Sequence, residues 1–274
     1  MRRAVAIACA VLATGCGSDT GPPAAVPARP VRIALLDPSP DLARGMRDAE
    51  RFVGAVETAD ERSADLVVTG DPAQAVEIAN RSPHARVLLV GAEPSDPVPG
   101  NLLAIQISRG QPAYLAGAVA GLTGARTVSI VGGGEELAAA VRAGAAEAGA
   151  AVQVAVAACG AAATADVRYA ERTSCLSGGG SGRVIAPAAV TGADQLAVIG
   201  PRAWVAVAAA ARAVQAGLWS PGVVLEGLRQ DVIGVGWISP SVTPRALDRL
   251  QRIEDMIRAG QAEIPVVAPV QQGE

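Results

Sequence analysis

Lysine is absent from this sequence of 274 residues, in which all 23 basic side chains are arginine and the formal net charge is −3. A chain without excess positive charge lacks the attraction that nucleic-acid-binding proteins use to hold phosphate groups. Aromatic residues are also scarce, at 2% of the chain, so a pocket would offer few rings for stacking. We therefore expect no nucleic-acid partner and few aromatic contacts to a ligand.

Histidine occurs once, as His84, and the sequence contains no C-x-x-C motif. Because zinc sites are built from clustered Cys and His ligands, no metal site is predicted. The sequence also has no G-x-S-x-G motif and no serine with a neighbouring histidine. No set of residues assembles a nucleophile, a base and an orienting group, so we predict neither an enzyme nor a cofactor.

No charge-free run after the amino terminus is long enough to span a bilayer. The first residues combine Arg2 and Arg3, a short apolar stretch at 4–13 and small residues before Cys16, which is the layout of a secretory signal. Ala13-Thr14-Gly15-Cys16 resembles a bacterial lipobox. The resemblance implies removal of a signal peptide at 1–15 and acylation of Cys16, which would anchor the chain to the outer face of the cell membrane. A plain signal peptide with a chance cysteine is the alternative.

Residues 16–30 are rich in small residues and proline, and such a composition is typical of a flexible tether. The body would then occupy roughly 31–267, which is enough for one large domain or two modest lobes, with a tail at 268–274. Cys159 and Cys175 are the cysteines that remain in this body. Outside the cytosol two remaining thiols indicate a disulfide, and two buried free thiols are the alternative.

The body alternates short apolar runs with helical patterns. The runs predicted as strands are 31–36, 65–69, 86–90, 102–107, 127–131, 152–156, 183–186 and 231–238, and the predicted helices include 165–175. Continuous apolar strands that alternate with helices are typical of parallel sheets covered on both faces. We therefore predict an α/β protein with an N-terminal lobe, 31–110, to which 231–267 returns, and a second lobe at 111–230 that includes the crossovers.

In open parallel sheets, ligands bind beyond the carboxyl ends of the strands. The residues that follow predicted strands and could contact a small-molecule solute there are Asp37, Asp71, Glu93, Gly132 and Gly133. Asp71 directly precedes Pro72, so helix capping is its alternative role. The glycines open a helix and could cradle a phosphate, but they lack the flanking pattern of a phosphate loop, and tight-turn packing is the simpler interpretation.

Several segments resemble the basic membrane protein (BMP) family of PnrA-like substrate-binding lipoproteins. The segments are Ala64–Asp71, Arg86–Val90, Pro99–Leu102, Gln111–Gly117, Val128–Gly133, Ala216–Gly222 and Ile257–Pro265. The resemblance implies a type I periplasmic-binding-protein fold with two Rossmann-like lobes. It also implies capture of a nucleoside-like solute for the permease of an ABC importer. Of the first-strand signature of the family only Asp37 is present, and the chain is shortened around 57–63 and 176–203. A degenerate family member that acts as a sensor or interaction protein is the alternative.

Overall fold

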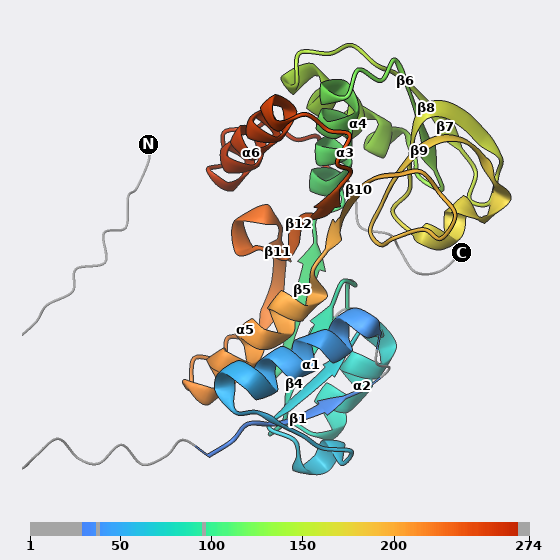
Figure 1. The fold of residues 1–274 in the computed structure, drawn as a ribbon. Coiled ribbons are helices and arrows are strands. Elements are labelled where there is room, and N and C mark those ends of the chain that lie inside the picture. Colours follow the sequence, from blue (N-terminus) through green and yellow to red (C-terminus); the bar gives the residue numbers. More distant parts are fainter. Residues whose placement is uncertain (1–28, 37–38, 95–96, 268–274) are drawn as a thin grey trace, which may run out of the picture.

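The computed structural model describes residues 29–36, 39–94 and 97–267. The predicted signal peptide, acylation site Cys16 and C-terminal tail lie outside these residues, as does the predicted ligand-binding residue Asp37. The described chain forms two lobes stacked end to end, and the chain passes between them three times (Figure 1).

Lobe 1 is built on a six-stranded sheet in the order β11-β5-β4-β3-β1-β2. Every neighbouring pair in this sheet is parallel. Its strands are β1 (Arg32–Leu35), β2 (Val56–Glu57), β3 (Leu66–Thr69), β4 (Arg86–Val90), β5 (Leu102–Ile107) and β11 (Gly222–Glu226), and its helices are α1 (Pro40–Val53), α2 (Pro72–Arg81), α5 (Ala203–Gln215) and the short 3-10 turn η1 (Glu61–Ser63). The central strands are mostly apolar because helices cover both faces of the sheet, with α1 and α5 on one side and α2 on the other.

Lobe 2 contains a second six-stranded sheet, in the order β12-β10-β9-β8-β6-β7. Its strands are β6 (Thr127–Val131), β7 (Gln153–Ala157), β8 (Ala163–Tyr169), β9 (Gly180–Ala186), β10 (Gln195–Pro201) and β12 (Ile233–Ile238), and its helices are α3 (Gly110–Leu122), α4 (Glu135–Glu147), α6 (Pro244–Arg258) and the 3-10 turns η2 (Thr173–Gly178) and η3 (Leu228–Gln230). Only β12 runs antiparallel to its neighbour, β10. In both sheets the second strand lies outside the first and the third lies on its other side, which is the doubly wound order of the flavodoxin type.

Helix α3 is buried on nearly every side, and two glycines explain how a second helix packs closely against it. A Cβ atom at Gly117 would overlap the carbonyl oxygen of Val141 on α4, and a Cβ at Gly144 would overlap the carbonyl oxygen of Tyr114 on α3. The two backbones therefore approach each other at both glycines. This packing fixes the first turns of α3 and α4, both of which begin at the boundary with lobe 1.

The chain crosses between the lobes from β5 to α3, from β10 to α5 and from β11 to β12. The segment that returns to lobe 1 is therefore 203–226, and the prediction that 231–267 returns there is wrong. That segment lies in lobe 2, where β12 pairs with β10 and α6 packs near α3. The apolar face of an amphipathic helix fits either sheet, so the sequence pattern alone does not select between the lobes.

The predicted helix at 165–175 is also wrong, because this stretch contains the end of β8 and the start of η2. β8 pairs with both β6 and β9, so its backbone hydrogen bonds are made in a sheet. The turn that follows is tied down by the Cys159–Cys175 disulfide, which the structure contains as the sequence predicts. Local helix propensity is a weak preference that such long-range pairing overrides.

Candidate functional site

A cleft of about 520 Å³ lies between the lobes, where strands of both sheets end. This volume falls in the range of small-molecule sites, roughly 300–1,000 Å³. The lining residues come from the ends of β4, β5, β6, β8, β9 and β10, and they are Gly91, Ala92, Glu93, Gln106, Ile107, Ser108, Arg109, Pro112, Gly132, Gly133, Gly134, Tyr169, Glu171, Arg172, Pro187, Ile199, Gly200 and Pro201. The cleft is therefore at the place where doubly wound sheets bind their ligands.

The polar centre of the cleft is an ion pair between Arg109 and Glu171. Nε of Arg109 donates to Oε1 of Glu171 at 2.9 Å, and Nη2 donates to Oε2 at 2.5 Å. Arg109 stands immediately before α3, in the first connection between the lobes, and Glu171 follows β8. The hydrogen bond to Glu171 raises the pKa of Arg109, against the lowering effect of burial. The two side chains thus hold each other in a fixed orientation at the first connection between the lobes, which is called the hinge below.

The charges that line the cleft balance. Glu93 and Glu171 are acidic, and Arg109 and Arg172 are basic. An ionic ligand would lose its hydration on entering the cleft, which costs free energy. A cleft without net charge has no excess of opposite charge to offset that cost. The arrangement therefore favours a polar solute without net charge.

The glycine turn after β6 is shaped by the disulfide. Gly132 has a φ of +78°, and a Cβ atom there would lie 2.6 Å from Sγ of Cys175. Its N–H donates to the carbonyl oxygen of Ala157 at 2.8 Å. Only glycine fits this left-handed conformation against the sulfur without strain, so the tight-turn interpretation of Gly132 holds.

Helix α4 begins directly after this turn, and Gly134 at its N-cap makes no side-chain capping bond. The carboxylate of Glu136 instead folds back over Gly134. Negative charge near a helix N-terminus is stabilising, and here the chain supplies it itself. A phosphate cradle at this position is therefore not supported.

Tyr169, the last residue of β8, lines the cleft. Its side chain is almost fully buried, and burial raises the pKa of its hydroxyl. The hydroxyl is therefore protonated at neutral pH. Among the residues that line the cleft, Tyr169 contributes the aromatic surface, so stacking contacts with a ligand are few.

Of the residues predicted from the sequence, Glu93, Gly132 and Gly133 line the cleft. Asp71 lies at the end of β3 but caps α2, because its Oδ1 accepts hydrogen bonds from the N–H groups of Ala73 at 2.8 Å and Gln74 at 3.1 Å. It does not line the cleft, so its alternative role as a cap is the one that the structure contains.

Sequence reasoning missed Arg109 and Glu171. Arg109 lies just after β5, so the same rule that selected Glu93 would have found it. Glu171 carried no such signal, because it fell within a stretch that was predicted as a helix. Their pairing across 62 residues of sequence is visible only in the folded chain.

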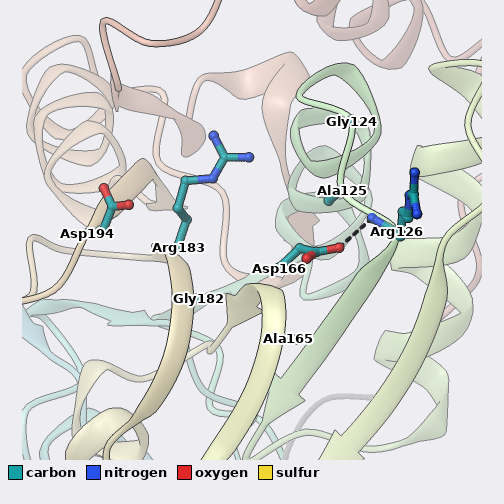
Figure 2. A pocket seen from close by; sticks show the side chains of 8 residues that line it. All are labelled: Gly124, Ala125, Arg126, Ala165, Asp166, Gly182, Arg183 and Asp194. Carbon is teal, nitrogen blue, oxygen red and sulfur yellow. Dashed lines mark hydrogen bonds between the residues drawn. The ribbon is translucent and has the colours of Figure 1, made fainter.

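A second depression, of about 560 Å³, lies at the opposite end of the lobe 2 sheet (Figure 2). The carboxylate of Asp166 accepts hydrogen bonds there from the N–H groups of Arg126 at 2.7 Å and Thr127 at 3.0 Å. These bonds lower the pKa of Asp166. They also join the start of β6 to β8, so we assign Asp166 to the structure of the sheet.

Within the described ranges, no group of three or more His, Cys, Asp or Glu side chains could hold a metal ion. No helix in the same ranges combines the length and the apolar character that crossing a membrane requires.

The fold is similar to solved structures of solute-binding proteins. An ABC transporter solute-binding protein from Conexibacter woesei DSM 14684 matches with a TM-score of 0.63 and 18% identity, over 86% of this chain and 99% of that one. A second ABC transporter solute-binding protein, from Aeropyrum pernix K1, matches with a TM-score of 0.60 and 15% identity, over 85% and 92%. The predicted type I periplasmic-binding-protein-like fold is thereby confirmed.

A transcriptional activator of the comK gene from Bacillus halodurans also shares the fold, with a TM-score of 0.65 and 15% identity over 85% of this chain and 99% of that one. No family model matches the sequence, and no curated protein matches it either. At these identities the likeness establishes the fold, and the function has to be argued from the cleft.

Proposed function

We propose that this chain is a lipid-anchored, extracytoplasmic solute-binding protein that captures a small polar solute and delivers it to the permease of an ABC importer. The observation that carries the proposal is the cleft itself. It lies at the carboxyl ends of both sheets, between two lobes joined by three connections, and the Arg109–Glu171 pair stands at its hinge. Solute-binding proteins that share this fold support the assignment.

The two lobes would bring different groups to the solute. Glu93 belongs to lobe 1, whereas Gly133 and Glu171 belong to lobe 2. A solute that contacts both sets makes all its contacts only when the lobes close, so binding favours the closed state. Ser108 lies in the first connection, where its N–H donates to the carbonyl oxygen of Glu226 in β11 at 2.9 Å. This bond ties two connections together, so they would bend as a unit.

The ligand we propose is an uncharged, nucleoside-like solute. The balanced charges of the cleft and the carboxylate of Glu136 over the start of α4 both disfavour a phosphorylated ligand. Nucleosides are the ligands that the resemblance to the BMP family implies. Hydrogen bonds to the sugar hydroxyls and the base edges would supply most of the affinity, because the cleft offers little aromatic surface.

Calorimetric titration tests this proposal. The mature chain would be titrated in parallel with nucleosides, the matching nucleotides, free bases and monosaccharides. We expect saturable binding of at least one nucleoside and weaker binding of its 5′-monophosphate. Tighter binding of the nucleotide would contradict the proposed ligand class. Binding of a monosaccharide alone would retain the solute-binding role and remove the nucleoside.

A second candidate is a sensor or interaction protein that no longer feeds a transporter. It is favoured by the activator from Bacillus halodurans, which is named for transcription and shares this fold. In this case no solute of any of the four classes would bind, and the Arg109–Glu171 pair would serve to keep the lobes in one arrangement.

A further inference from the structure

We propose that the base of lobe 1 carries an apolar surface that contacts lipid and holds the anchored protein upright, with its cleft clear of the membrane. The surface consists of Phe52, Val56 and Leu218 and is called the basal surface below. The proposal rests on the lipid anchor predicted at Cys16. It does not depend on which solute, if any, the cleft binds.

The three side chains lie along one edge of the lobe 1 sheet. All strands of this sheet are parallel, so their starts share an edge. Val56 is the first residue of β2, and Phe52 is the penultimate residue of α1, four positions earlier. Leu218 lies four positions before Gly222, where β11 starts, and β11 is the outermost strand on the other side of the sheet from β2. This edge is opposite the carboxyl ends of the strands, where the cleft lies.

The helix ends that carry Phe52 and Leu218 are tied together. Nε2 of Gln215, the last residue of α5, donates to the carbonyl oxygen of Val53, the last residue of α1, at 3.0 Å. The N–H of Leu218 donates to the carbonyl oxygen of Ala213 at 2.8 Å, which folds the following loop back against α5. The two helices therefore end at the same corner of lobe 1 (Figure 1).

These three side chains are among the large apolar side chains that are exposed in the described part of the chain. Phe52 is 59% exposed, Val56 is 49% exposed and Leu218 is 74% exposed. Large apolar side chains that gather on one surface mark a contact with another body. The guanidinium carbon of Arg51 lies 5.3 Å from the centre of the Phe52 ring. Phe and Leu together with arginine are side chains that occur where protein segments lie in the headgroup region of a bilayer.

The chain arrives at this same edge from its predicted anchor. Arg29, Pro30 and Val31 directly precede β1, and the N–H of Val56 donates to the carbonyl oxygen of Val31 at 2.9 Å. Cys16 lies 13 residues before Arg29. Over that length, the flexible tether that the composition of 16–30 predicts would have an end-to-end distance of about 20 Å. The acylated end would therefore keep the lipid surface close to the base.

An anchored chain is already held at the membrane, so a weak second contact between the basal surface and lipid forms as an intramolecular step and is effective. A surface of three side chains is then enough to bias the orientation while remaining reversible. Exposed side chains of both signs, Glu50, Arg51 and Glu57, flank Phe52 and Val56 in the sequence, so the proposed contact is an apolar one and does not depend on attraction to anionic lipid. The cleft, at the far edge of the sheet, would face the medium from which solute is captured.

Hydrogen–deuterium exchange of the acylated full-length chain in phosphatidylcholine nanodiscs tests the proposal. The reference is the unacylated Cys16→Ala chain in solution. We expect slower exchange on the membrane in peptides covering 50–57 and 216–221. Peptides around Val156 and Leu247 are the internal control, because these residues are exposed apolar side chains of lobe 2. They should exchange equally in both samples.

A Phe52→Ser, Leu218→Ser double variant should lose the protection at the base, whereas a Val156→Ser, Leu247→Ser double variant should keep it. Thermal denaturation would verify that both variants fold. Equal exchange of the basal peptides with and without the membrane would overturn the proposal, as would an equal loss in both variants. An N-terminal peptide without an acyl group would overturn it as well, and solute binding measured separately would be unaffected. Nanodiscs containing phosphatidylglycerol should give the same protection, and a requirement for anionic lipid would replace the apolar contact with an electrostatic one.

Discussion

Nε and Nη2 of the Arg109 guanidinium both donate to the carboxylate of Glu171, with shortest distances of 2.9 and 2.5 Å. Each side chain keeps 20% of its surface exposed, so the pair is held by the protein and yet reachable by a solute. The pair links the hinge to the end of β8. Because of this position, we expect a substitution in the pair to weaken solute binding.

Glu171→Gln should weaken solute binding by roughly ten- to a hundredfold. The substitution keeps the shape of the side chain but removes its charge, and hydrogen bonds to charged groups contribute about 1.5–3 kcal/mol. Calorimetric titration with the solute found by the screen measures the effect. Glu135→Gln is the matched control, because Glu135 forms an exposed ion pair with Arg142 at 2.6 Å and is not among the residues that line the cleft. Equal affinity in both variants would remove the ion pair from the binding site.

Gly132→Ala should destabilise the protein more than Gly149→Ala. Both glycines have a φ near +78°, at 78° and 79°, so both alanines carry the left-handed strain of about 1–2 kcal/mol. Only the Cβ at position 132 would also overlap Cys175, whereas the surroundings of Gly149 are open. We expect an additional cost of about 1–3 kcal/mol at position 132. Urea denaturation measures this cost. Identical midpoints for the two variants would show that the turn after β6 accommodates a Cβ atom without loss of stability.

Removal of the disulfide should lower the free energy of unfolding by about 2–4 kcal/mol. Cys159 and Cys175 are 16 positions apart, and in the chain-entropy model a loop of this length contributes about 3 kcal/mol. The Cys159→Ala, Cys175→Ala double variant tests the effect by denaturant unfolding. The wild-type chain unfolded under reducing conditions serves as the control and should match the variant. An unchanged midpoint in both would assign the bond no role in stability.

Asp71→Ala should destabilise α2 by about 1 kcal/mol, as the loss of an N-cap does, and should leave solute binding unchanged. Glu93→Gln should weaken solute binding and leave the stability of the protein unchanged, since Glu93 lines the cleft and Asp71 does not. Thermal unfolding and calorimetric titration of both variants separate the two roles. Weaker binding in a folded Asp71→Ala chain would return Asp71 to the site.

Cys16→Ala should release the protein from the membrane. The signal layout that ends at Cys16 predicts acylation of its sulfur, and without that sulfur no diacylglycerol can be attached. Detergent-phase partitioning of the wild type and the variant measures the difference. If the two chains partition equally, the cysteine does not carry the anchor.

The sequence by itself determined the class of fold and part of the cleft. Continuous apolar runs such as 87–90 are stable only when both faces of a sheet are covered, so the parallel architecture follows from composition and spacing. The rule that ligands bind at strand ends identified Glu93, Gly132 and Gly133 without reference to contacts. Counting the cysteines that follow the predicted signal peptide and anchor identified the Cys159–Cys175 pair.

Tertiary structure decided which sheet each crossing strand joins and which side chains meet in the cleft. β11 and β12 are adjacent in sequence but belong to different sheets, and their own side chains do not encode that division. Residues 165–169 form a strand because β6 and β9 supply hydrogen bonds on both sides. Arg109 and Glu171 meet because two packed helices and a paired strand bring the hinge to the end of β8. These outcomes depend on contacts between distant segments, which local patterns of hydrophobicity do not contain.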